Sequence, residues 1–304
     1  MSPTSNINVN AKSGNPIFPG WYADPEARIF DTTYWIYPTT STVYEAQTTL
    51  DAFSSSDLLT WTRHPHVLNI TRIPWSTNRA AWAPSVVAAH DTYYMYFSAG
   101  DGAGIGVARS VSGRPDGPFE DVIGKPLVPE TIHGAQPIDA QVFIDDDASV
   151  WLYFGGWSHA VVVPLASDMV SLAGDYKEIT PKDYVEGPWV LKRKGVYYFM
   201  YSVGGWGDSS YGVSYVTGPS PTGPFSTTPR KILQGDGVVG DSTGHNSVFT
   251  PDGGATYYIV YHRRPVGDTE RDHRVTCIDR MEFDEEGNIL PVKITADGVE
   301  GRPL

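Results

Sequence analysis

Three acidic residues occupy similar places in the sequence and could perform acid–base chemistry together. Asp24, Asp139 and Glu186 each begin a short apolar stretch of the chain. Hydrolysis of a glycosidic bond needs carboxyl groups in opposed roles, one protonated to assist the leaving oxygen and one ionised to activate water. A third carboxyl group can orient the acid and tune its pKa. These residue types therefore predict a glycoside hydrolase.

A pattern of paired strands repeats five times along the chain and positions these acidic residues. Each copy has a short apolar strand, a polar or glycine-containing turn and an aromatic strand. The copies begin at Asp24, Ala83, Asp139, Glu186 and His245. Because a four-stranded propeller blade takes about 40–50 residues, and more with long loops, this spacing suits one blade per copy. The repeat therefore predicts an all-β fold, a five-bladed β-propeller.

Two β-sandwiches are the alternative, since each would also contain several hairpins. Sandwiches do not usually repeat one motif five times at similar spacing, so we favour the propeller. No linker-like tract divides the chain, and we expect residues 1–304 to form one propeller domain with a short polar tail over residues 1–14. Residues 274–292 carry strand signals and are expected to supply outer strands that help to close the ring.

The inner strands of a propeller run in one direction, so their first residues meet around one mouth of the central channel. That mouth would hold Asp24, Ala83 with Trp82 before it, Asp139, Glu186 and His245. Like charges that converge are costly unless their pKa values separate or a cation intervenes. We interpret this ring as a catalytic site, whereas the acidic run 145–147 falls in a hairpin turn and is interpreted as a solvated loop.

Bulk properties exclude several classes of protein. The net charge of −13 argues against a nucleic-acid partner, because such partners need a basic surface. Cys277 is the only cysteine, so no disulfide can form within the chain. Residues 1–14 lack the apolar centre of a signal peptide, and no apolar run has the length of a membrane span. We expect a soluble protein, located in the cytoplasm or secreted with its signal removed.

Several short segments, spread over residues 15–291, together resemble glycoside hydrolase family 43. They are Tyr-Ala-Asp-Pro-Glu at 22–26, Trp-Ala-Pro-Ser-Val at 82–86, Gln-Pro-Ile-Asp at 136–139, Val-Glu-Gly-Pro at 185–188, Gly-His-Asn-Ser at 244–247 and His-Arg-Val at 273–275. Each segment alone is weakly specific, but the set is highly specific. The family is five-bladed and inverting, so the resemblance implies the same architecture that the repeats predict.

The resemblance also implies roles for individual residues. Asp24 would be the general base, Glu186 the general acid, and Asp139 the residue that orients Glu186 and raises its pKa. Arg274 resembles an arginine that reaches into the sugar pocket. His245 resembles a histidine near the axial channel, where many members hold a calcium or similar ion, usually through water. Direct binding by His245 alone would be unusual, since calcium prefers oxygen ligands; no organic cofactor is expected.

Three tryptophans are candidate sugar-binding residues. Trp82 follows from its place at the rim of the channel. Trp157 and Trp206 each end a Gly-Gly-Trp segment after an aromatic strand, so their loops could reach the pocket. Packing within a blade is the alternative for Trp157 and Trp206.

The expected substrate is an arabinose- or xylose-containing oligo- or polysaccharide of plant cell-wall hemicellulose or pectin side chains. Many β-xylosidases of the family carry an extra C-terminal β-sandwich, whereas this chain ends at Leu304, near the end of the propeller. We therefore expect an exo-acting α-L-arabinofuranosidase, with β-xylosidase as a second activity. An endo-arabinanase is the alternative within the family.

Two classes outside this family were weighed. Retaining, fructan-cleaving propellers typically carry an Asn-Asp-Pro-Asn signature and an Arg-Asp-Pro segment. This chain has Ala-Asp-Pro-Glu at 23–26 and no Arg-Asp-Pro. A non-catalytic sugar-binding propeller would repeat similar sites in every blade. The rim residues here differ from blade to blade, which favours catalysis.

Overall fold

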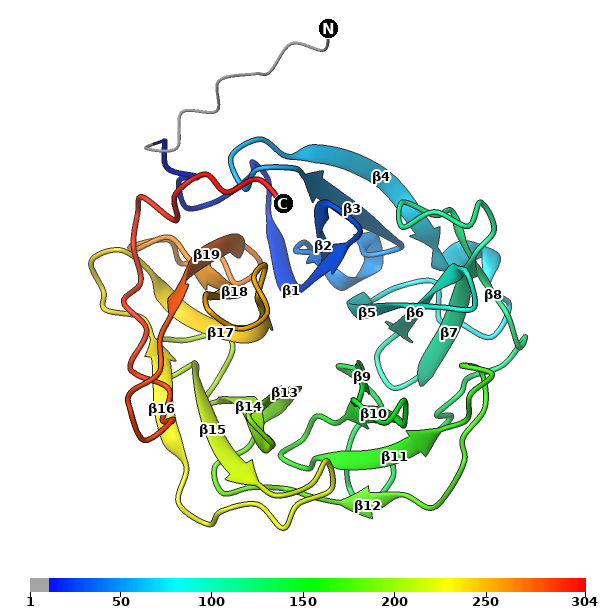
Figure 1. The fold of residues 1–304 in the computed structure, drawn as a ribbon. Coiled ribbons are helices and arrows are strands. Elements are labelled where there is room, and N and C mark those ends of the chain that lie inside the picture. The colour runs from blue at the N-terminus through cyan, green and yellow to red at the C-terminus, as the bar shows by residue number, and fades with distance from the viewer. Residues whose placement is uncertain (1–10) are drawn as a thin grey trace, which may run out of the picture.

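The computed structural model describes residues 11–304 and shows a five-bladed β-propeller (Figure 1). Five separate antiparallel sheets stand around a central axis, and in each sheet the strands follow sequence order from the axis outward. The predicted fold class and number of blades are confirmed. Residues 1–10 of the expected polar tail lie outside the described residues. Within residues 11–304, no helix has the length and apolar character that crossing a membrane requires.

Each predicted hairpin corresponds to the first two strands of a blade. Blades one and two contain β1 (Tyr22–Phe30), β2 (Thr33–Thr40), β3 (Thr49–Ser55) and β4 (Thr62–Asn69), then β5 (Ala81–Ala89), β6 (Thr92–Ala99), β7 (Ile105–Ser110) and β8 (Phe119–Asp121). Blades three and four contain β9 (Gln141–Ile144), β10 (Val150–Phe154), β11 (Val161–Leu165) and β12 (Lys177–Glu178), then β13 (Glu186–Arg193), β14 (Val196–Val203), β15 (Gly212–Gly218) and β16 (Arg230–Gln234). Blade five contains β17 (Asp241–Phe249), β18 (Tyr257–Arg264) and β19 (Val275–Met281). Two short 3-10 helices lie at Tyr44–Ala46 and Ile70–Arg72.

A buried tyrosine on the second strand of every blade fills the core. These residues are Tyr37, Tyr96, Tyr153, Tyr201 and Tyr261. Four of their hydroxyl groups donate to backbone carbonyls and the fifth donates to a carboxylate. A buried tyrosine supplies a large apolar ring and needs a partner for its hydroxyl, so this arrangement satisfies both requirements. The aromatic second strands seen in the sequence are thus the packing elements of the ring.

The two ends of the described chain meet beside blade five and close the ring. The N–H of Ile17 donates to the carbonyl of Thr276, so the segment before β1 lies against β19. The N–H of Ser13 donates to the carbonyl of Val299 at 2.8 Å. Of the segment expected to supply outer strands, β19 is the third strand of blade five. Beyond it the chain runs along blade four without pairing as a regular strand, with the N–H of Val292 bonded to the carbonyl of Ile232.

Every inner strand has the same irregularity near its start, a residue in the left-handed conformation. These residues are Asp24 (φ 49°), Ala83 (φ 41°), Asp139 (φ 59°), Gly187 (φ 62°) and His245 (φ 45°). In four blades a β-bulge interrupts the register at this point. The repeat therefore aligns Asp24 with Gly187, and Glu186 lies one position earlier, in line with Trp82. The prediction that all three carboxylates occupy matching positions is wrong for Glu186, because Gly187, which precedes Pro188 as Asp24 precedes Pro25, takes the left-handed position in that blade.

Candidate active site

The starts of the inner strands surround a pocket at one end of the propeller axis. It contains about 420 Å³ of empty space, including its open mouth, and its lining comes from all five blades. The lining residues are Asp24, Tyr44, Trp82, Ile138, Asp139, Glu186, Trp206, His245 and Arg274. The structure therefore brings together every predicted site residue except Trp157. Tyr44 and Ile138 were not predicted.

Side chains from neighbouring blades hold the left-handed residues in place. In each case a backbone N–H at the start of an inner strand donates to a side chain at the end of the preceding blade's second strand. The pairs are Ala83 with Thr39 Oγ1 at 2.8 Å, Asp139 with Ser98 Oγ at 3.3 Å, His245 with Ser202 Oγ at 3.0 Å and Asp24 with His262 Nδ1 at 3.1 Å. Left-handed backbone is costly for residues other than glycine, so such bonds stabilise the ring of functional residues.

Blade three departs from this pattern, and the departure involves Asp139. The matching position, directly after its second strand, is Gly155, where an added Cβ would lie 2.1 Å from the carbonyl oxygen of His159. No side chain fits there, and the N–H of Gly187 donates instead to Oδ2 of Asp139 at 3.0 Å. Because Gly187 directly follows Glu186, this bond connects the Asp139 carboxylate to the backbone that carries Glu186. It is a direct route by which Asp139 can orient Glu186.

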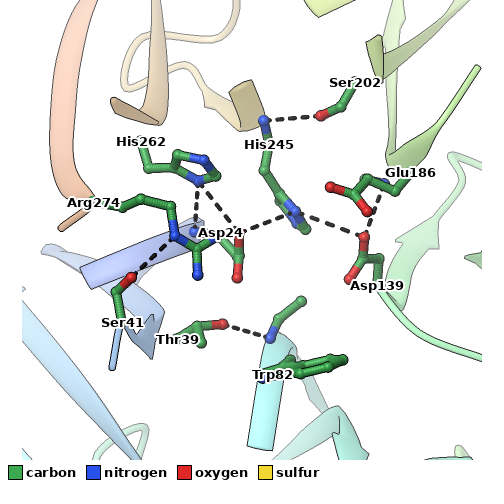
Figure 2. Close-up of polar contacts among 12 residues, drawn as sticks. Asp24, Thr39, Ser41, Trp82, Asp139, Glu186, Ser202, His245, His262 and Arg274 are labelled. Atoms are coloured by element: carbon green, nitrogen blue, oxygen red, sulfur yellow. Dashed lines mark hydrogen bonds and ion pairs between the residues drawn. The ribbon is translucent and has the colours of Figure 1, made fainter. Parts of the chain in front are cut away.

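Asp24 lies among groups that favour its ionised form. Arg274 Nη1 is 3.3 Å from Asp24 Oδ1, and Arg274 Nε donates to Ser41 Oγ, which holds the guanidinium in place (Figure 2). Burial acts to raise the pKa of Asp24, but the charge of the Arg274 guanidinium, with smaller contributions from His245 and His262, outweighs it, and the pKa is lowered from its ordinary value. Asp24 is therefore a carboxylate that stays ionised in acid, as a general base requires.

His262 supports Asp24 as a neutral ring. Because Nδ1 accepts the backbone N–H of Asp24, the proton of the neutral imidazole is on Nε2. Burial, together with the nearby Arg274 charge, lowers the pKa of His262 to about 4 despite the adjacent Asp24 carboxylate. His262 was missed in the sequence, although it stands where other blades carry Thr39, Ser98 and Ser202. Alignment of the five repeats would have singled it out.

Glu186 lies in an environment of the opposite kind. Burial raises its pKa, the negative charge of Asp24 raises it further, and these effects outweigh the hydrogen bond from Tyr211 and the charge of Arg274. Tyr211 OH donates to Glu186 Oε1 at 2.7 Å. The pKa of Asp139 is raised well above its usual range by burial and by the nearby Glu186 carboxyl. Each of the two carboxyls opposes ionisation of the other, so the pair favours retention of a proton.

His245 stands between the two kinds of environment. Its Nδ1 is 3.4 Å from Asp24 Oδ1 and 3.8 Å from Asp139 Oδ2 (Figure 2). Burial lowers the pKa of His245, and Arg274 adds to this effect while Asp24 opposes it. A largely neutral imidazole therefore separates Asp24 from the Asp139–Glu186 pair.

Aromatic rings form the sides of the pocket. Trp82 Nε1 donates to Gln47 Oε1, and Tyr44 packs edge-on against Trp82 with ring centroids 4.9 Å apart. Trp206 lies under the guanidinium of Arg274, 5.0 Å from ring centroid to Cζ. Such faces are suited to stacking on sugar rings. The predictions that Trp82 and Trp206 lie at the pocket agree with this arrangement.

Trp157 lies outside the pocket lining. The N–H of the next residue, Ser158, donates to the carbonyl of Val185, which brings this loop beside the chain that leads into Glu186. The indole itself is 61% exposed and Trp157 has a left-handed backbone, with φ 54°. The same Gly-Gly-Trp motif therefore leads to two different places, because Trp206 is held by arginines across the pocket and Trp157 has no such partners.

The described residues do not fit a directly bound calcium ion. Calcium takes six to eight oxygen ligands, whereas residues 11–304 contain no group of three or more His, Cys, Asp or Glu side chains suited to a metal. The axial cavity beneath the site is lined by His245 and Glu26 among others. Glu26 Oε1 is 2.5 Å from Arg28 and accepts a hydrogen bond from Ser85 Oγ, so a guanidinium already neutralises this carboxylate.

The chain is similar to known glycoside hydrolases. The family model described as glycosyl hydrolases family 43 matches residues 13–289. A β-D-galactofuranosidase of Aspergillus niger is 69% identical over 304 residues, covering 97% of this chain and 89% of that protein. Among solved structures, an α-L-arabinofuranosidase from Clostridium thermocellum has a TM-score of 0.76 and 30% identity, covering 91% of this chain and 95% of its own. An arabinoxylan arabinofuranohydrolase from Bacillus subtilis, solved in complex with cellotetraose, has a TM-score of 0.81 and 26% identity, covering 97% of this chain and 72% of its own.

Proposed function

Because the chain belongs to glycosyl hydrolase family 43, we propose that it removes single terminal furanose residues, foremost β-D-galactofuranose, from oligo- or polysaccharides with inversion at the anomeric carbon. The observation that carries this proposal is the 69% identity to a protein named as a β-D-galactofuranosidase. The pocket, lined from all five blades, suits a single terminal sugar better than an open groove would.

An α-L-arabinofuranosidase, the activity expected from the sequence, is the second candidate. β-D-Galactofuranose and α-L-arabinofuranose have the same configuration around the ring. They differ in the group on C4, which is dihydroxyethyl in galactofuranose and hydroxymethyl in arabinofuranose. A pocket that accepts the larger group also has room for the smaller one, although it forfeits the contacts of the missing carbon. The likeness to a solved α-L-arabinofuranosidase favours this candidate.

The proposed mechanism assigns the proton transfers to the two ends of the pocket. Asp24 takes a proton from a water molecule as the oxygen of that water bonds to the anomeric carbon. Glu186 gives its proton to the glycosidic oxygen as the bond from that oxygen to the anomeric carbon breaks. Attack and departure occur on opposite faces of the sugar, so the configuration inverts. Asp24 ends protonated and Glu186 ionised, and exchange with solvent restores both.

The remaining site residues support these transfers. Asp139 holds the backbone beside Glu186 and opposes loss of the Glu186 proton. Arg274 keeps Asp24 ionised and is positioned to donate hydrogen bonds to the sugar. Trp82 and Trp206 flank the sugar, whereas Trp157, exposed beside the chain that leads to Glu186, is placed to contact the leaving group.

A substrate panel and the stereochemistry of the product test this proposal. The purified protein would be given aryl β-D-galactofuranoside, aryl α-L-arabinofuranoside and aryl β-D-xyloside, together with debranched arabinan. We expect the highest kcat/KM on the galactofuranoside, followed by the arabinofuranoside, and no oligosaccharide products from the arabinan. Proton NMR of the first product formed should show the inverted anomer. A retained anomer would exclude Asp24 as a base, and a preference for the xyloside would exclude a furanosidase.

A further inference from the structure

Arg271 connects two aromatic residues of the pocket wall that come from distant parts of the chain. Its guanidinium lies over the ring of Tyr44 at 4.8 Å and over the ring of Trp206 at 5.1 Å. Tyr44 belongs to the 3-10 helix of blade one, Trp206 to the loop between β14 and β15 of blade four, and Arg271 to the loop between β18 and β19 of blade five. Both rings line the pocket, and Arg271 itself does not.

The loop that carries Trp206 is rich in glycine, and the hydrogen bonds that reach it hold its backbone and not the indole: Arg264 Nη2 donates to the carbonyl of Gly207, and Ser242 Oγ donates to the carbonyl of Asp208. Gly204, Gly205 and Gly207 surround the tryptophan, and an added Cβ at Gly207 would have no neighbour within 4 Å. Arg274 contacts Trp206 as well, but its guanidinium is already held by Asp24 and Ser41. Arg274 and Arg271 thus both connect the Trp206 ring to blade one, and Arg271 is the residue that connects it to the Tyr44 ring.

The Asp272 carboxylate holds the guanidinium of Arg271 along one edge. Its Nη2 is 3.0 Å from Asp272 Oδ2, and its Nε donates to Asp272 Oδ1. A planar guanidinium bound to a carboxylate along its edges keeps its faces free for aromatic rings. Tyr44 in turn packs against Trp82. The chain of contacts thus runs from Trp206 through Arg271 and Tyr44 to Trp82.

We propose that Arg271 is a positioning residue that determines how tightly the pocket holds the terminal sugar, because it fixes Trp206 against Tyr44 as one continuous wall. This inference rests on the proposed function for its choice of substrates. Since Arg271 touches neither Asp24 nor Glu186, its removal should loosen binding of the sugar and leave the proton transfers unchanged. The expected signature is a higher KM at an unaltered kcat and pH profile.

Four single variants and one double variant test the proposal with whichever aryl glycoside the full chain hydrolyses best. Loss of the two cation–π contacts is expected to weaken binding of the sugar about tenfold. Arg271→Met should therefore raise KM about tenfold with kcat within about twofold. Arg271→Lys keeps the charge, so its KM should lie between those of the wild type and Arg271→Met. Arg280→Met is the matched control, because Arg280 lies over Tyr258 at 5.4 Å on β19, away from the pocket. It should leave both constants unchanged.

The double variant asks whether Arg271 acts through Trp206. In a Trp206→Phe background, Arg271→Met should raise KM less than about twofold, since the ring it holds is already altered. An unchanged KM in Arg271→Met, a fall in kcat alone, or a full tenfold effect in the Trp206→Phe background would each overturn the proposal. A wild-type preference for xylosides would contradict the proposed function but leave this comparison intact.

Fluorescence gives a measurement that does not depend on turnover. The difference in acrylamide quenching between the wild type and Trp206→Phe reports the accessibility of the Trp206 indole. We expect Arg271→Met to raise that accessibility and Arg280→Met to leave it unchanged. Equal quenching in wild type and Arg271→Met would show that Arg271 does not hold the Trp206 ring.

Discussion

Asp24 and Glu186 lie in one pocket, yet their surroundings act on a carboxyl group in opposite directions. Both are screened from water, which favours the protonated form. At Asp24 the guanidinium of Arg274 and two histidines reverse this effect and lower the pKa. At Glu186 no cation of residues 11–304 forms an ion pair, the negative charge of Asp24 adds to the effect of burial, and the pKa is raised. The difference shows that neighbouring charges, and not residue type or burial, separate a candidate base from a candidate acid.

The strongest challenge to this comparison is removal of either carboxyl group. Asp24→Asn and Glu186→Gln should each lower kcat/KM for an unactivated glycoside about 10³-fold or more, because each removes one of the two proton transfers. Steady-state kinetics with a natural oligosaccharide would measure the loss. Asp175→Asn makes the same chemical change at an exposed position and should have no effect. Retention of activity in either site variant would contradict the assignment.

Removal of the cation that distinguishes the Asp24 end should have the next largest effect. Arg274→Met leaves the burial of Asp24 unopposed by the nearest charge, so the pKa of Asp24 should rise. Because activity needs ionised Asp24, the acidic limb of the pH profile should move to higher pH. We also expect about a 10²-fold loss of kcat/KM as a buried charge-assisted contact disappears. An acidic limb that stays in place would show that Arg274 does not control Asp24.

A smaller change is expected at the acid end when Tyr211 is altered. The hydrogen bond from Tyr211 favours the ionised form of Glu186, so Tyr211→Phe should raise the pKa of Glu186. Because activity needs protonated Glu186, the alkaline limb should move to higher pH, with less than about a tenfold loss at the optimum. Tyr201→Phe, in the same blade, removes a hydroxyl bonded to the carbonyl of Lys182 and should lower stability without moving either limb. A downward shift of the alkaline limb would contradict the account.

The smallest effect is expected from metal removal. Arg28 already neutralises Glu26 in the axial cavity, and the described residues do not form a calcium site. Treatment with EDTA should therefore leave both kcat/KM and the melting temperature unchanged, and added calcium should not alter them. A loss of activity that calcium restores would show that the cavity holds an ion through water.

The repeat in the sequence predicted the ring well, because five aromatic hairpins report directly on five inner strand pairs. The apolar pattern alone does not give the register of Glu186, since the left-handed position that marks the start of the other inner strands falls one residue later, at Gly187. As a result Glu186 aligns with Trp82 and not with Asp24. Asp24, Trp82, Asp139, Glu186 and His245 stand at or beside the starts of inner strands and were predicted, because those starts meet wherever a propeller closes, whereas Ile138 was missed.

Residues outside the inner strands were harder to predict. Tyr211 and His262 reach the site from other strands and loops, and Tyr44 from a 3-10 helix. The surroundings of Tyr44 and Tyr211 resemble those of packing tyrosines elsewhere in the chain, whereas His262 differs from the hydroxyl residues at the matching position of other blades and could have been found by aligning the repeats. Trp157 and Trp206 share a motif but differ in location, since their loops are fixed by contacts with other blades. Such contacts depend on the closed ring and have no local signature.

The dependence of the rate on the leaving group most directly tests the division of labour between Asp24 and Glu186. Aryl glycosides with phenols of increasing acidity need progressively less help from a general acid. We predict that Glu186→Gln approaches wild-type activity with the most acidic phenol and falls steeply as the phenol becomes less acidic. Asp24→Asn should be impaired to a similar extent with every phenol, because water activation is needed in each case. The opposite pattern, or the same dependence in both variants, would contradict the account.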